Sequence, residues 1–452
     1  MPSDASQAAT STNATDTIAA IATASGKGAI GIIKISGARS HEIGVLLTGQ
    51  QLKPRLARYT PFCSADGKAI DHGVAIYFKS PDSYTGEDVL ELQSHGNHIL
   101  LDQLLQAATA AGARPARPGE FTERAFLNDK MDLAQAEAVS DLIQASTAEA
   151  ASAAVRSLQG EFSAGIAVIL EQLLNCRVYI ESALDFAEEE IDFLKDNELA
   201  DRFAALDRSV SQLLLRSHEG ALLRDGISIV IAGLPNVGKS SLLNRLTGQD
   251  TAIVTDIAGT TRDVLKEKIN IDGMPIHIID TAGLRSSDDP IEQEGVRRAH
   301  DQIKQADRIL FVVLAGQQPD ATLLAELPEN IPVSVVMNKS DLNAENKSKQ
   351  QGILVSAKTG AGFEDLRAHL KQCAGFEKTS EGALMARRRH IDALLGAQQH
   401  IKSAHHRLVK EGAGELAAEE LRQAQDQINL ITGEFTSDDL LGEIFSRFCI
   451  GK

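Results

Sequence analysis

The chain has 452 residues, about three times the length of a typical domain, so two or three separate cores are expected. Hydrophobic residues make up 43% and charged residues 24%, as in ordinary soluble proteins, and no apolar run approaches the roughly 18 residues of a membrane helix. The formal charge of −17 at pH 7 excludes a chain-wide positive surface that would collect nucleic acid nonspecifically.

The N-terminal segment and the cysteines give no sign of export. The first 15 residues include Asp4, and the first basic side chain is Lys27, so we expect a disordered polar extension rather than a targeting signal. The four cysteines are far apart and lack the spacing of a metal site, which favours a reducing compartment. We therefore expect a cytoplasmic protein that does not span a membrane.

Changes in composition divide the rest of the chain. Residues 16–128 contain short β-like runs and a helical stretch at 99–110, bounded by Gly, Pro and Asp, which predicts an α+β domain. Residues 129–225 are rich in Ala, Leu, Glu and Gln at helical spacing, and this composition returns over 376–452. Strands and helices alternate over 226–375. We expect this α/β domain to be inserted into a loop of one helical bundle.

The α/β domain opens with a phosphate-binding motif. The sequence GLPNVGKS, Gly233 to Ser240, follows a strand-like run and precedes a helix-like one. In such a loop, backbone N–H groups and the helix N-terminus face the phosphates. Lys239 would neutralise the β and γ phosphates, and the Ser240 hydroxyl would bind Mg²⁺. The alternative is a glycine-rich helix start without a ligand, and the motifs that follow disfavour it.

Those motifs are IAGTTRD, DTAG at 280–283, NKSD at 338–341 and SAK at 356–358, in the order and spacing of translation-factor-type GTPases. Between them, an Asp272-Gly273 turn is predicted to join two strands in a hairpin that leads to Asp280. The Asp341 carboxylate only accepts hydrogen bonds, so it matches the N1–H and the exocyclic amine of guanine. The expected nucleotide is GTP rather than ATP.

The residue that positions the attacking water cannot be read from these motifs alone. Thr261 is the natural second protein ligand of Mg²⁺. Leu284 stands where Ras-like enzymes carry a water-orienting glutamine, and a leucine cannot do this. The next stretch supplies carboxylates, and the residues themselves do not separate Asp289, Glu292 and Glu294.

Longer matches point to one family. The runs GLPNVGKSSLLNRL, TDIAGTTRD, DTAGLR and the C-terminal FCIGK occur together with PDSYTGEDVLELQSHG and RPGEFTERAFLNDKMDLAQAEAVSDLI. In this combination the chain resembles the MnmE (TrmE) family of tRNA modification GTPases over nearly everything after Thr15. The fold class implied is α/β plus α, with an N-terminal folate-binding-like domain (16–128), a helical domain in two parts (129–225 and 376–452) and an inserted Ras-like GTPase domain (226–375) whose sheet is mostly parallel.

The resemblance implies a potassium-dependent GTPase whose G domains pair across their nucleotide faces. Potassium would be held by Asn236, Thr255, Ile257 and Thr260, although from the residues alone Asn236 reads as a turn former. The family places the water-orienting carboxylate nine positions after the DTAG glycine, at Glu292. Together, the motifs and the resemblance predict that GTP is bound by Asn236, Val237, Gly238, Lys239, Ser240, Ser241, Thr255, Asp256, Ile257, Ala258, Gly259, Thr260, Thr261, Asp280, Thr281, Ala282, Gly283, Asn338, Lys339, Asp341, Ser356, Ala357 and Lys358.

The resemblance also implies that the N-terminal domain forms a homodimer and binds a one-carbon tetrahydrofolate, the 5,10-methylene form or a 5-formyl analogue. By motif position the folate contacts are Lys34, Glu91, Lys130 and Lys452. The family usually has Arg at position 34, so a bidentate contact becomes a point charge, and weaker folate binding is expected. Two further features are open to alternative interpretations. Cys449 is either a catalytic group or part of the packed tail, and the RRRH run at 387–390 is either a solvated helix face or a tRNA phosphate contact.

The implied activity is modification of C5 of the wobble uridine in certain tRNAs, adding a carboxymethylaminomethyl or aminomethyl group. The implied partner is an FAD-dependent protein of the MnmG (GidA) type in a heterotetramer, and the −17 charge suggests that this partner supplies most of the positive surface for tRNA. The alternative is a GTPase switch in ribosome assembly that uses no small molecule. It shares all the G-domain motifs, but it has no use for a folate pocket.

Overall fold

The computed structural model describes residues 16–185, 197–249, 266–280, 306–325, 327–328, 330–342, 352–376, 382–433, 438–446 and 448–451. The chain divides into two compact units. The first comprises Met1–Ser140 with Asn429–Lys452, and the second comprises Asp141–Ile428.

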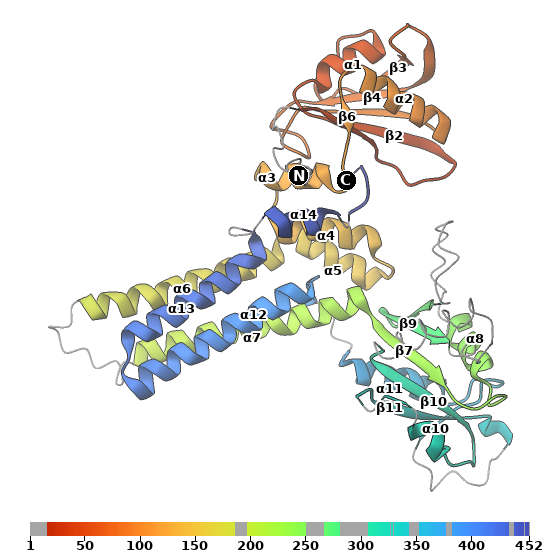
Figure 1. Ribbon diagram of the computed structural model, residues 1–452, viewed down its shortest axis with the longest axis vertical. Helices are drawn as coiled ribbons and strands as arrows, with labels where there is room; N and C mark the ends of the chain where they lie inside the picture. The colour runs from red at the N-terminus through yellow and green to blue at the C-terminus, as the bar shows by residue number, and fades with distance from the viewer. Residues whose placement is uncertain are drawn as a thin grey trace, which may run out of the picture. The chain divides into compact units, whose positions relative to one another are not determined.

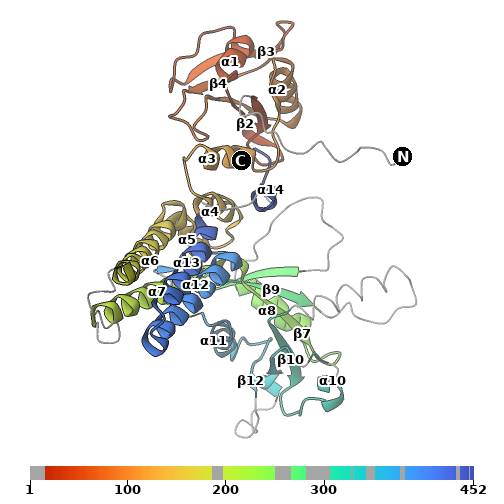
Figure 2. The same cartoon turned by 60° about the vertical axis from the view of Figure 1, so that its left-hand side comes forward.

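The first unit is built on a six-stranded sheet in the order β3-β4-β5-β2-β1-β6. Its strands are β1 (Ile18–Ile21), β2 (Gly28–Ser36), β3 (Arg58–Cys63), β4 (Ala69–Phe78), β5 (Val89–Gly96) and β6 (Arg114–Pro115). Helices α1 (Ser40–Thr48) and α2 (His98–Ala110) pack on it (Figure 2). Ile33, Ile35, Leu90 and Leu92 are fully buried in the core that they share. Because side chains alternate along a strand, Lys34 and Glu91 point to the other face of the sheet.

The C-terminal end of the chain belongs to this first unit. Helix α14 (Asp438–Ser446) packs its Phe445 against the start of α4 (Leu133–Gln144), in a small core with Leu133 and Phe448. Helix α3 (Glu120–Leu127) begins beside this core, where the backbone of Gly119 closely approaches Phe445. The tail that follows is thereby held next to α3.

The second unit contains a bundle of long helices. They are α5 (Ala148–Leu158), α6 (Glu161–Asp185), α7 (Asn197–Asp225), α12 (Arg388–His406) and α13 (Gly414–Thr432), with a π-helical turn at Arg407–Glu411 (Figure 1). The buried residues of α6 recur every three or four positions, as expected for a bundle helix, from Phe162 through Ile166 and Ile169 to Leu173. The helices that precede and follow the α/β domain are joined by side chains: Arg177 donates to Gln425 at 2.7 Å, and Gln398 donates to Asp207 at 3.1 Å.

Helix α6 differs from the sequence-based expectation in one respect. By length and composition alone, Glu161–Leu184 is apolar enough to cross a membrane, a test that core helices of soluble proteins also pass. Charged residues within this segment divide it into shorter apolar stretches, so the sequence contains no continuous apolar run of that length.

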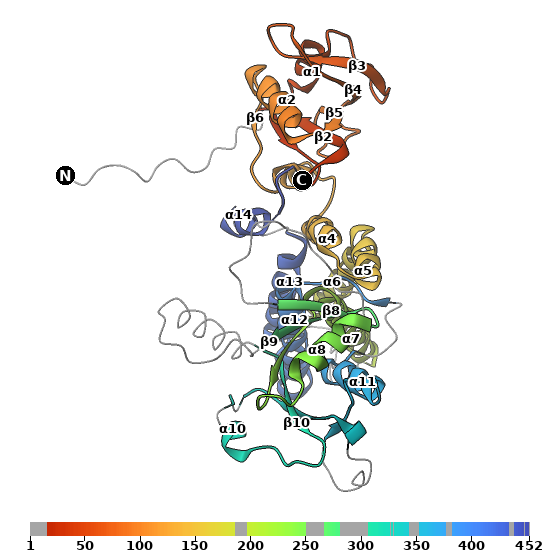
Figure 3. The ribbon, with the colours of Figure 1, turned by 90° about the vertical axis from the view of Figure 1, so that its right-hand side faces the viewer.

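The α/β part of the second unit has a six-stranded sheet in the order β12-β11-β10-β7-β9-β8. The strands are β7 (Ile227–Ala232), β8 (Lys266–Ile271), β9 (Met274–Asp280), β10 (Arg308–Leu314), β11 (Val333–Asn338) and β12 (Ile353–Leu354). Only the β8–β9 pair is antiparallel. Helices α8 (Lys239–Gln249) and α11 (Phe363–Ala374) cover one face, and α10 (Ala321–Ala325) lies on the other (Figure 3). We call this part the G domain.

The G domain leaves and rejoins the bundle at neighbouring points. Strand β7 follows α7 directly, and the returning chain is held to the same helix because Leu384 N–H donates to the carbonyl of Arg216 at 3.1 Å. The predicted combination of an α+β domain, a helical bundle and an inserted α/β domain with a mostly parallel sheet is confirmed.

The RRRH run differs from the solvated face that its charge suggests. Arg388 is 92% exposed, but the Arg387 side chain is 15% exposed and donates to Asp141 at 3.1 Å. His390 is buried, with its ring centroid 5.2 Å from that of Phe162. The run therefore mixes one solvated arginine with side chains that hold the start of α12 in the bundle.

Candidate functional site

The phosphate loop lies where β7 ends and α8 begins. Strand β7 is the inner strand between β10 and β9, so the loop emerges at the carboxyl edge of a parallel sheet, where such folds bind ligands. The loop packs so closely on the end of β11 that a Cβ at Gly238, whose φ is +94°, would lie 2.3 Å from Asn338 Nδ2. Only glycine fits there.

Lys239 is held inside the turn of this loop. Its ammonium donates to the carbonyls of Gly233 at 2.8 Å and Leu234 at 2.9 Å. Ser240 follows it in the first turn of α8 and is exposed. The cation and the hydroxyl predicted to contact phosphate and Mg²⁺ thus lie together at one helix N-terminus.

Asn338 joins the phosphate loop to the other side of the site. It is 1% exposed at the end of β11, and its Nδ2 donates to the carbonyl of Val237 at 2.9 Å. Its Oδ1 accepts from the backbone N–H of Lys339 at 2.8 Å and from that of Ala357 at 3.0 Å. The Lys339 ammonium donates to the carbonyl of Asn236 at 2.9 Å. Three predicted motifs are therefore joined by hydrogen bonds.

Asp341 is fixed by the SAK segment. The Ser356 hydroxyl donates to Asp341 Oδ1 at 2.6 Å, and this hydrogen bond lowers the pKa of the carboxyl. Asp341 is therefore an ionised acceptor at neutral pH, as recognition of the guanine N1–H and amine requires. A cavity of about 230 Å³ lies next to Lys339, lined by Leu314, Ala315, Gly316, Gln317, Lys339 and Leu342.

Part of the predicted nucleotide site lies outside the described residues. Asp280 ends β9, opposite Ile231 of β7, which brings its backbone to the phosphate-loop edge of the sheet. The predicted nucleotide-site residues that lie outside the described part of the chain are Thr255, Asp256, Ile257, Ala258, Gly259, Thr260, Thr261, Thr281, Ala282, Gly283 and Glu292. Lys452 of the predicted folate set also lies outside it.

In the first unit, the structure brings Lys34 and Glu91 together. They are register partners on β2 and β5, and both point to the sheet face opposite α1 and α2. The Lys34 ammonium lies 4.8 Å from the ring centroid of Tyr84 and 5.5 Å from that of Phe121. Aromatic faces attract a cation, so these rings help to hold the ammonium over the sheet.

Lys130 and the tail border the same face from other segments. The Lys130 ammonium donates to the carbonyl of Pro81 at 3.1 Å, in the loop that also carries Tyr84. In the tail, Cys449 is exposed, and its backbone carbonyl accepts a hydrogen bond from the backbone N–H of Gly119 at 3.3 Å. Gly451 packs against the backbone of Ile21. β1, which contains Ile21, pairs with the Lys34 strand.

A partly buried ion network beside this face was not found from the sequence. Ser36, two residues after Lys34 on β2, donates to Glu87 of this network at 2.7 Å. Arg124, whose side chain is 11% exposed, donates to Glu87 at 3.0 Å, to Asp16 at 2.6 Å and to Glu120 at 3.2 Å. Arg114 also pairs with Glu120, which is 2% exposed. Burial by itself would raise the pKa of Glu120, but the hydrogen bonds from Arg114 and from the backbone outweigh it and hold the pKa below its ordinary value. The RPGEFTER run (117–124) carries Glu120 and Arg124, whereas Arg114, Glu87 and Asp16 lie outside it, and nothing in the run indicates burial.

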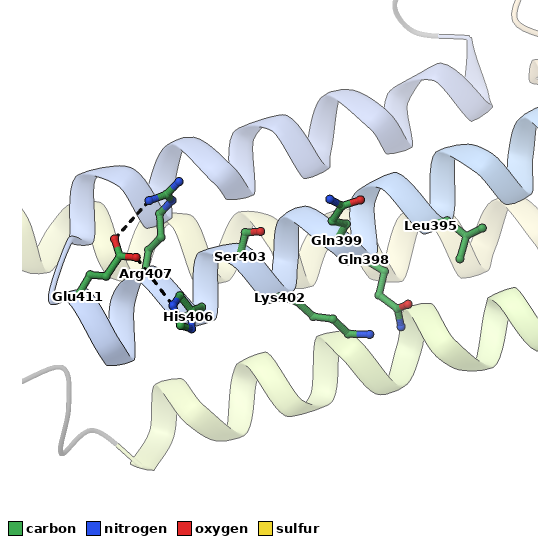
Figure 4. Close-up of a pocket in the computed structure, with 8 residues that line it drawn as sticks. All are labelled: Leu395, Gln398, Gln399, Lys402, Ser403, His406, Arg407 and Glu411. Atoms are coloured by element: carbon green, nitrogen blue, oxygen red, sulfur yellow. Dashed lines mark hydrogen bonds and ion pairs between the residues drawn. The ribbon is translucent and has the colours of Figure 1, made fainter.

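Another cavity, of about 460 Å³, lies over α12 and the turn at 407–411 (Figure 4). It shares no residue with either predicted site. Its cations are balanced locally: Glu411 pairs with Arg407 at 3.2 Å and with His406 at 3.8 Å, and Lys402 lies 4.0 Å from Asp207. Such exposed, internally paired charges do not make an anion site.

Comparisons with known proteins cover nearly all of the chain. The family model "GTP-binding protein TrmE N-terminus" matches residues 17–130, and "MnmE helical domain" matches residues 133–449. The tRNA modification GTPase MnmE of Vibrio vulnificus (strain YJ016) is 54% identical over 452 residues, covering 97% of this chain and 100% of the relative. The protein of that name from Pseudomonas aeruginosa (strain UCBPP-PA14) is 54% identical over 453 residues, covering 97% and 99%. Among solved structures, the G domain of the T. maritima FeoB iron transporter is 26% identical and covers 33% of this chain and 98% of its own, with a TM-score of 0.24.

Proposed function

This chain belongs to the MnmE family of tRNA modification GTPases, and on that premise we propose that it is a potassium-dependent GTPase that modifies C5 of the wobble uridine in certain tRNAs. It works in the cytoplasm as a homodimer, in a heterotetramer with an FAD-dependent MnmG-type partner. A one-carbon tetrahydrofolate on the N-terminal domain supplies the carbon that becomes attached to the base.

The observation that carries the GTPase assignment is the joined nucleotide site. Asn338 bridges the phosphate loop and the SAK segment, while Ser356 holds Asp341 as an acceptor for guanine. When GTP binds, the Lys239 ammonium gives up its hydrogen bonds to the carbonyls of Gly233 and Leu234 and donates to the β and γ phosphates instead, because a charged acceptor makes the stronger hydrogen bond. The backbone N–H groups of Val237, Gly238 and Ser240 complete the phosphate cradle.

The donor set fits the two expected ions. The exposed Ser240 hydroxyl at the start of α8 is an oxygen ligand of the type that Mg²⁺ prefers, with Thr261 as its partner. Asn236 has a left-handed backbone with φ of +62° in the phosphate loop, a conformation that asparagine adopts more readily than most other residues. It would hold K⁺ together with Thr255, Ile257 and Thr260, and the ion would offset charge that develops on the γ-phosphate. Glu292 would orient the attacking water.

The N-terminal proposal rests on paired charges beside the tail. Glu91 accepts from the amine groups of a pterin, while Lys34, Lys130 and Lys452 face the folate carboxylates. Lys34 and Glu91 are register partners, and Gly451 packs on the neighbouring strand, so these contacts can converge on one ligand. Cys449 lies in the same tail and is a candidate group for the one-carbon step.

Steady-state GTP hydrolysis in potassium and sodium buffers of equal ionic strength tests the GTPase half. We expect strong potassium stimulation that is lost in Glu292→Ala while nucleotide still binds. Glu294→Ala and Asp289→Ala are matched controls, since the residues alone do not separate these three carboxylates. Equal rates in both salts would contradict the potassium assignment and favour a generic switch.

Binding of 5-formyltetrahydrofolate to the full-length chain tests the other half. Glu91→Gln should weaken binding by about 10-fold or more, because a donor amide replaces the acceptor that the pterin needs. Glu42→Gln, an exposed carboxylate of α1 in the same unit, is the matched control and should leave affinity unchanged. A wild-type chain that binds no folate would contradict the proposal and leave the ribosome-assembly switch.

A further inference from the structure

The β8–β9 hairpin links the nucleotide site to a distant point of the second unit. β8 begins at Lys266, five positions after the predicted Mg²⁺ ligand Thr261, and β9 ends at Asp280 of the DTAG motif. Its strands of six and seven residues span about 20 Å, so the Asp272-Gly273 tip lies far from the phosphates. Both ends of the hairpin are thus continuous with residues predicted to contact GTP, while the tip is not.

The tip is docked on helix α5 of the bundle. The Glu149 side chain lies directly over Gly273, so that a Cβ added there would be 2.5 Å from Glu149 Cδ and 2.6 Å from its Cγ. Asp272 and Gly273 have φ of +49° and +93°, as a two-residue hairpin turn requires. Because Gly273 has no side chain, Glu149 can lie directly against its backbone. Lys371 of α11 forms an ion pair with Asp272. Figure 1 shows β9 next to α5.

Helix α5 is also part of the hydrophobic core of the G domain. Ala150, Ala153 and Ala154, each at most 1% exposed, belong to the same buried cluster as Ile269 and Ile271 of β8. Such small side chains let the helix approach the hairpin closely. A shift of the hairpin therefore cannot be absorbed by a flexible layer between the two elements.

The opposite end of α5 holds the chain where it returns from the G domain. Arg156 donates to the carbonyl of Ala383 through Nε at 3.0 Å and through Nη2 at 2.7 Å, and the Ser157 hydroxyl donates to the carbonyl of Met385 at 3.2 Å. Residues 383–386 lead directly into α12. One helix of 11 residues therefore contacts both the hairpin tip and the chain that enters the second half of the bundle.

We propose that α5 transmits the nucleotide state of the G domain to the helical bundle, with Glu149 as the positioning residue at the hairpin tip. GTP binding and hydrolysis move the hairpin at its nucleotide end, and the tip passes this displacement to α5 and, through Arg156, to α12. The inference rests on the proposal that GTP hydrolysis drives tRNA modification, and it names the contact through which the two are coupled.

A reversible cross-link tests the relay in the full-length chain. A disulfide between Glu149→Cys and Gly273→Cys suits the close approach of these positions. With the bond formed, which keeps the tip attached to α5, we expect GTP hydrolysis and wobble-uridine modification within about twofold of wild type. After reduction with dithiothreitol, which leaves neither the bond nor the Glu149 side chain, we expect unchanged hydrolysis and modification about 10-fold lower, within the range of typical coupling between sites. The two single-cysteine variants and the wild type, which has four native cysteines, receive the same oxidation and reduction.

Three outcomes would overturn the relay. Normal modification by the reduced double variant would show that the contact is not needed. Loss of hydrolysis together with modification after reduction would show that the contact supports the nucleotide site instead. Modification that is equally low with and without the bond would mean that the substitutions, and not loss of the link, cause the defect.

Substitutions without a new bond provide an independent measurement. Glu149→Ala should lower modification without changing GTP hydrolysis, and Glu149→Gln, which keeps the side chain over Gly273, should restore it. Glu161→Ala, which removes an exposed carboxylate paired with Arg216 in the same bundle, should change neither. Equal modification by Glu149→Ala and wild type would contradict the relay.

A separate variant distinguishes failure of the relay from failure of the function on which it rests. Lys239→Ala removes the phosphate-contacting cation and should abolish hydrolysis and modification together. If Lys239→Ala still modifies tRNA, GTP hydrolysis does not drive the reaction, and the relay has nothing to transmit.

Discussion

The nucleotide site of the G domain is assembled mainly through backbone groups, whereas the predicted folate site of the N-terminal unit consists of charged side chains beside a partly buried ion network. In the first, Asn338 and Lys339 bond to carbonyls and N–H groups of the phosphate loop and the SAK segment. In the second, Lys34 and Glu91 are register partners on adjacent strands, and Ser36, two residues from Lys34, donates to Glu87 of the ion network at 2.7 Å.

This difference determines how visible each site is along the chain. Backbone recognition needs glycines and capping residues at fixed local spacing, so it leaves short motifs that can be read directly. Side-chain recognition, as proposed for folate, would gather residues 34, 91 and 130 and the tail from segments far apart in the sequence. It also makes the N-terminal site depend more strongly on charge, and the following experiments test that contrast.

The largest effect is expected at the base of the nucleotide. Asp341→Asn replaces one carboxylate oxygen by an amide NH₂ group, which is a donor. This donor opposes the exocyclic amine of guanine but can pair with the carbonyl that xanthine has at the same position. We expect the preference for GTP over XTP to fall by about 10⁴, as measured by competition for binding. Asp320→Asn, an exposed carboxylate of the same domain held by Thr322, is the control. An unchanged preference would show that Asp341 does not read the base.

In the N-terminal unit, the largest effect is expected from the partly buried ion network. Glu120→Ala removes the most buried carboxylate of the network and leaves Arg114 and Arg124 with only Asp16 and Glu87 as partners. Breaking a buried ion pair costs up to about 3–5 kcal/mol of unfolding free energy. Glu123→Ala removes a carboxylate whose partner, Arg117, is 51% exposed, and should cost about 1 kcal/mol or less. Urea denaturation of the full-length variants measures both, and equal losses would mean that the network is not a charged core.

Acid should weaken the same unit further. Burial alone would raise the pKa of Asp71, but hydrogen bonds from the Ser94 hydroxyl and from His95 outweigh it and lower the pKa to about 2. A lowered folded-state pKa means that this stabilisation is complete above the ordinary value of 3.8 and is lost as the pH falls from there toward 2. We expect about 1–2 kcal/mol to be lost over that window. Asp71→Asn should remove this part of the pH dependence of denaturation, and an unchanged profile would contradict the assignment.

The smallest change is expected at Lys34. Arginine there would offer a planar, bidentate donor and would also stack on Tyr84 and Phe121. Lys34→Arg should tighten folate binding by up to about 10-fold, measured by titration with 5-formyltetrahydrofolate. Lys53→Arg, in the same unit, is the control. Weaker binding in Lys34→Arg would mean that the pocket has adapted to a lysine.

Much of the G domain could be predicted because its signals are local. The Asp272-Gly273 turn, the strand before Gly233 and the guanine contact predicted for Asp341 all follow from residues within a few positions of one another. The insertion of this domain into one bundle was also predictable, because helical composition stops and resumes on either side of it.

The ion network and the start of α12 could not be predicted, because burial of a charge depends on a distant partner. Arg387 finds Asp141, 246 positions earlier, and Arg124 finds Asp16, 108 positions earlier. A run such as RRRH looks the same whether its arginines meet water or a carboxylate. The contact between Glu149 and Gly273 was hidden for the same reason.

Isotope tracing into the wobble uridine would show directly whether GTP hydrolysis and folate chemistry meet in one reaction. The purified chain, its MnmG-type partner and unmodified tRNA would be incubated in potassium buffer with GTP and a tetrahydrofolate that carries a ¹³C one-carbon unit, and the nucleosides analysed by mass spectrometry. The account predicts ¹³C in the C5 substituent, lost when GTP or folate is omitted or when Lys239→Ala replaces the wild type. Rapid GTP hydrolysis with no label in the uridine would contradict the account.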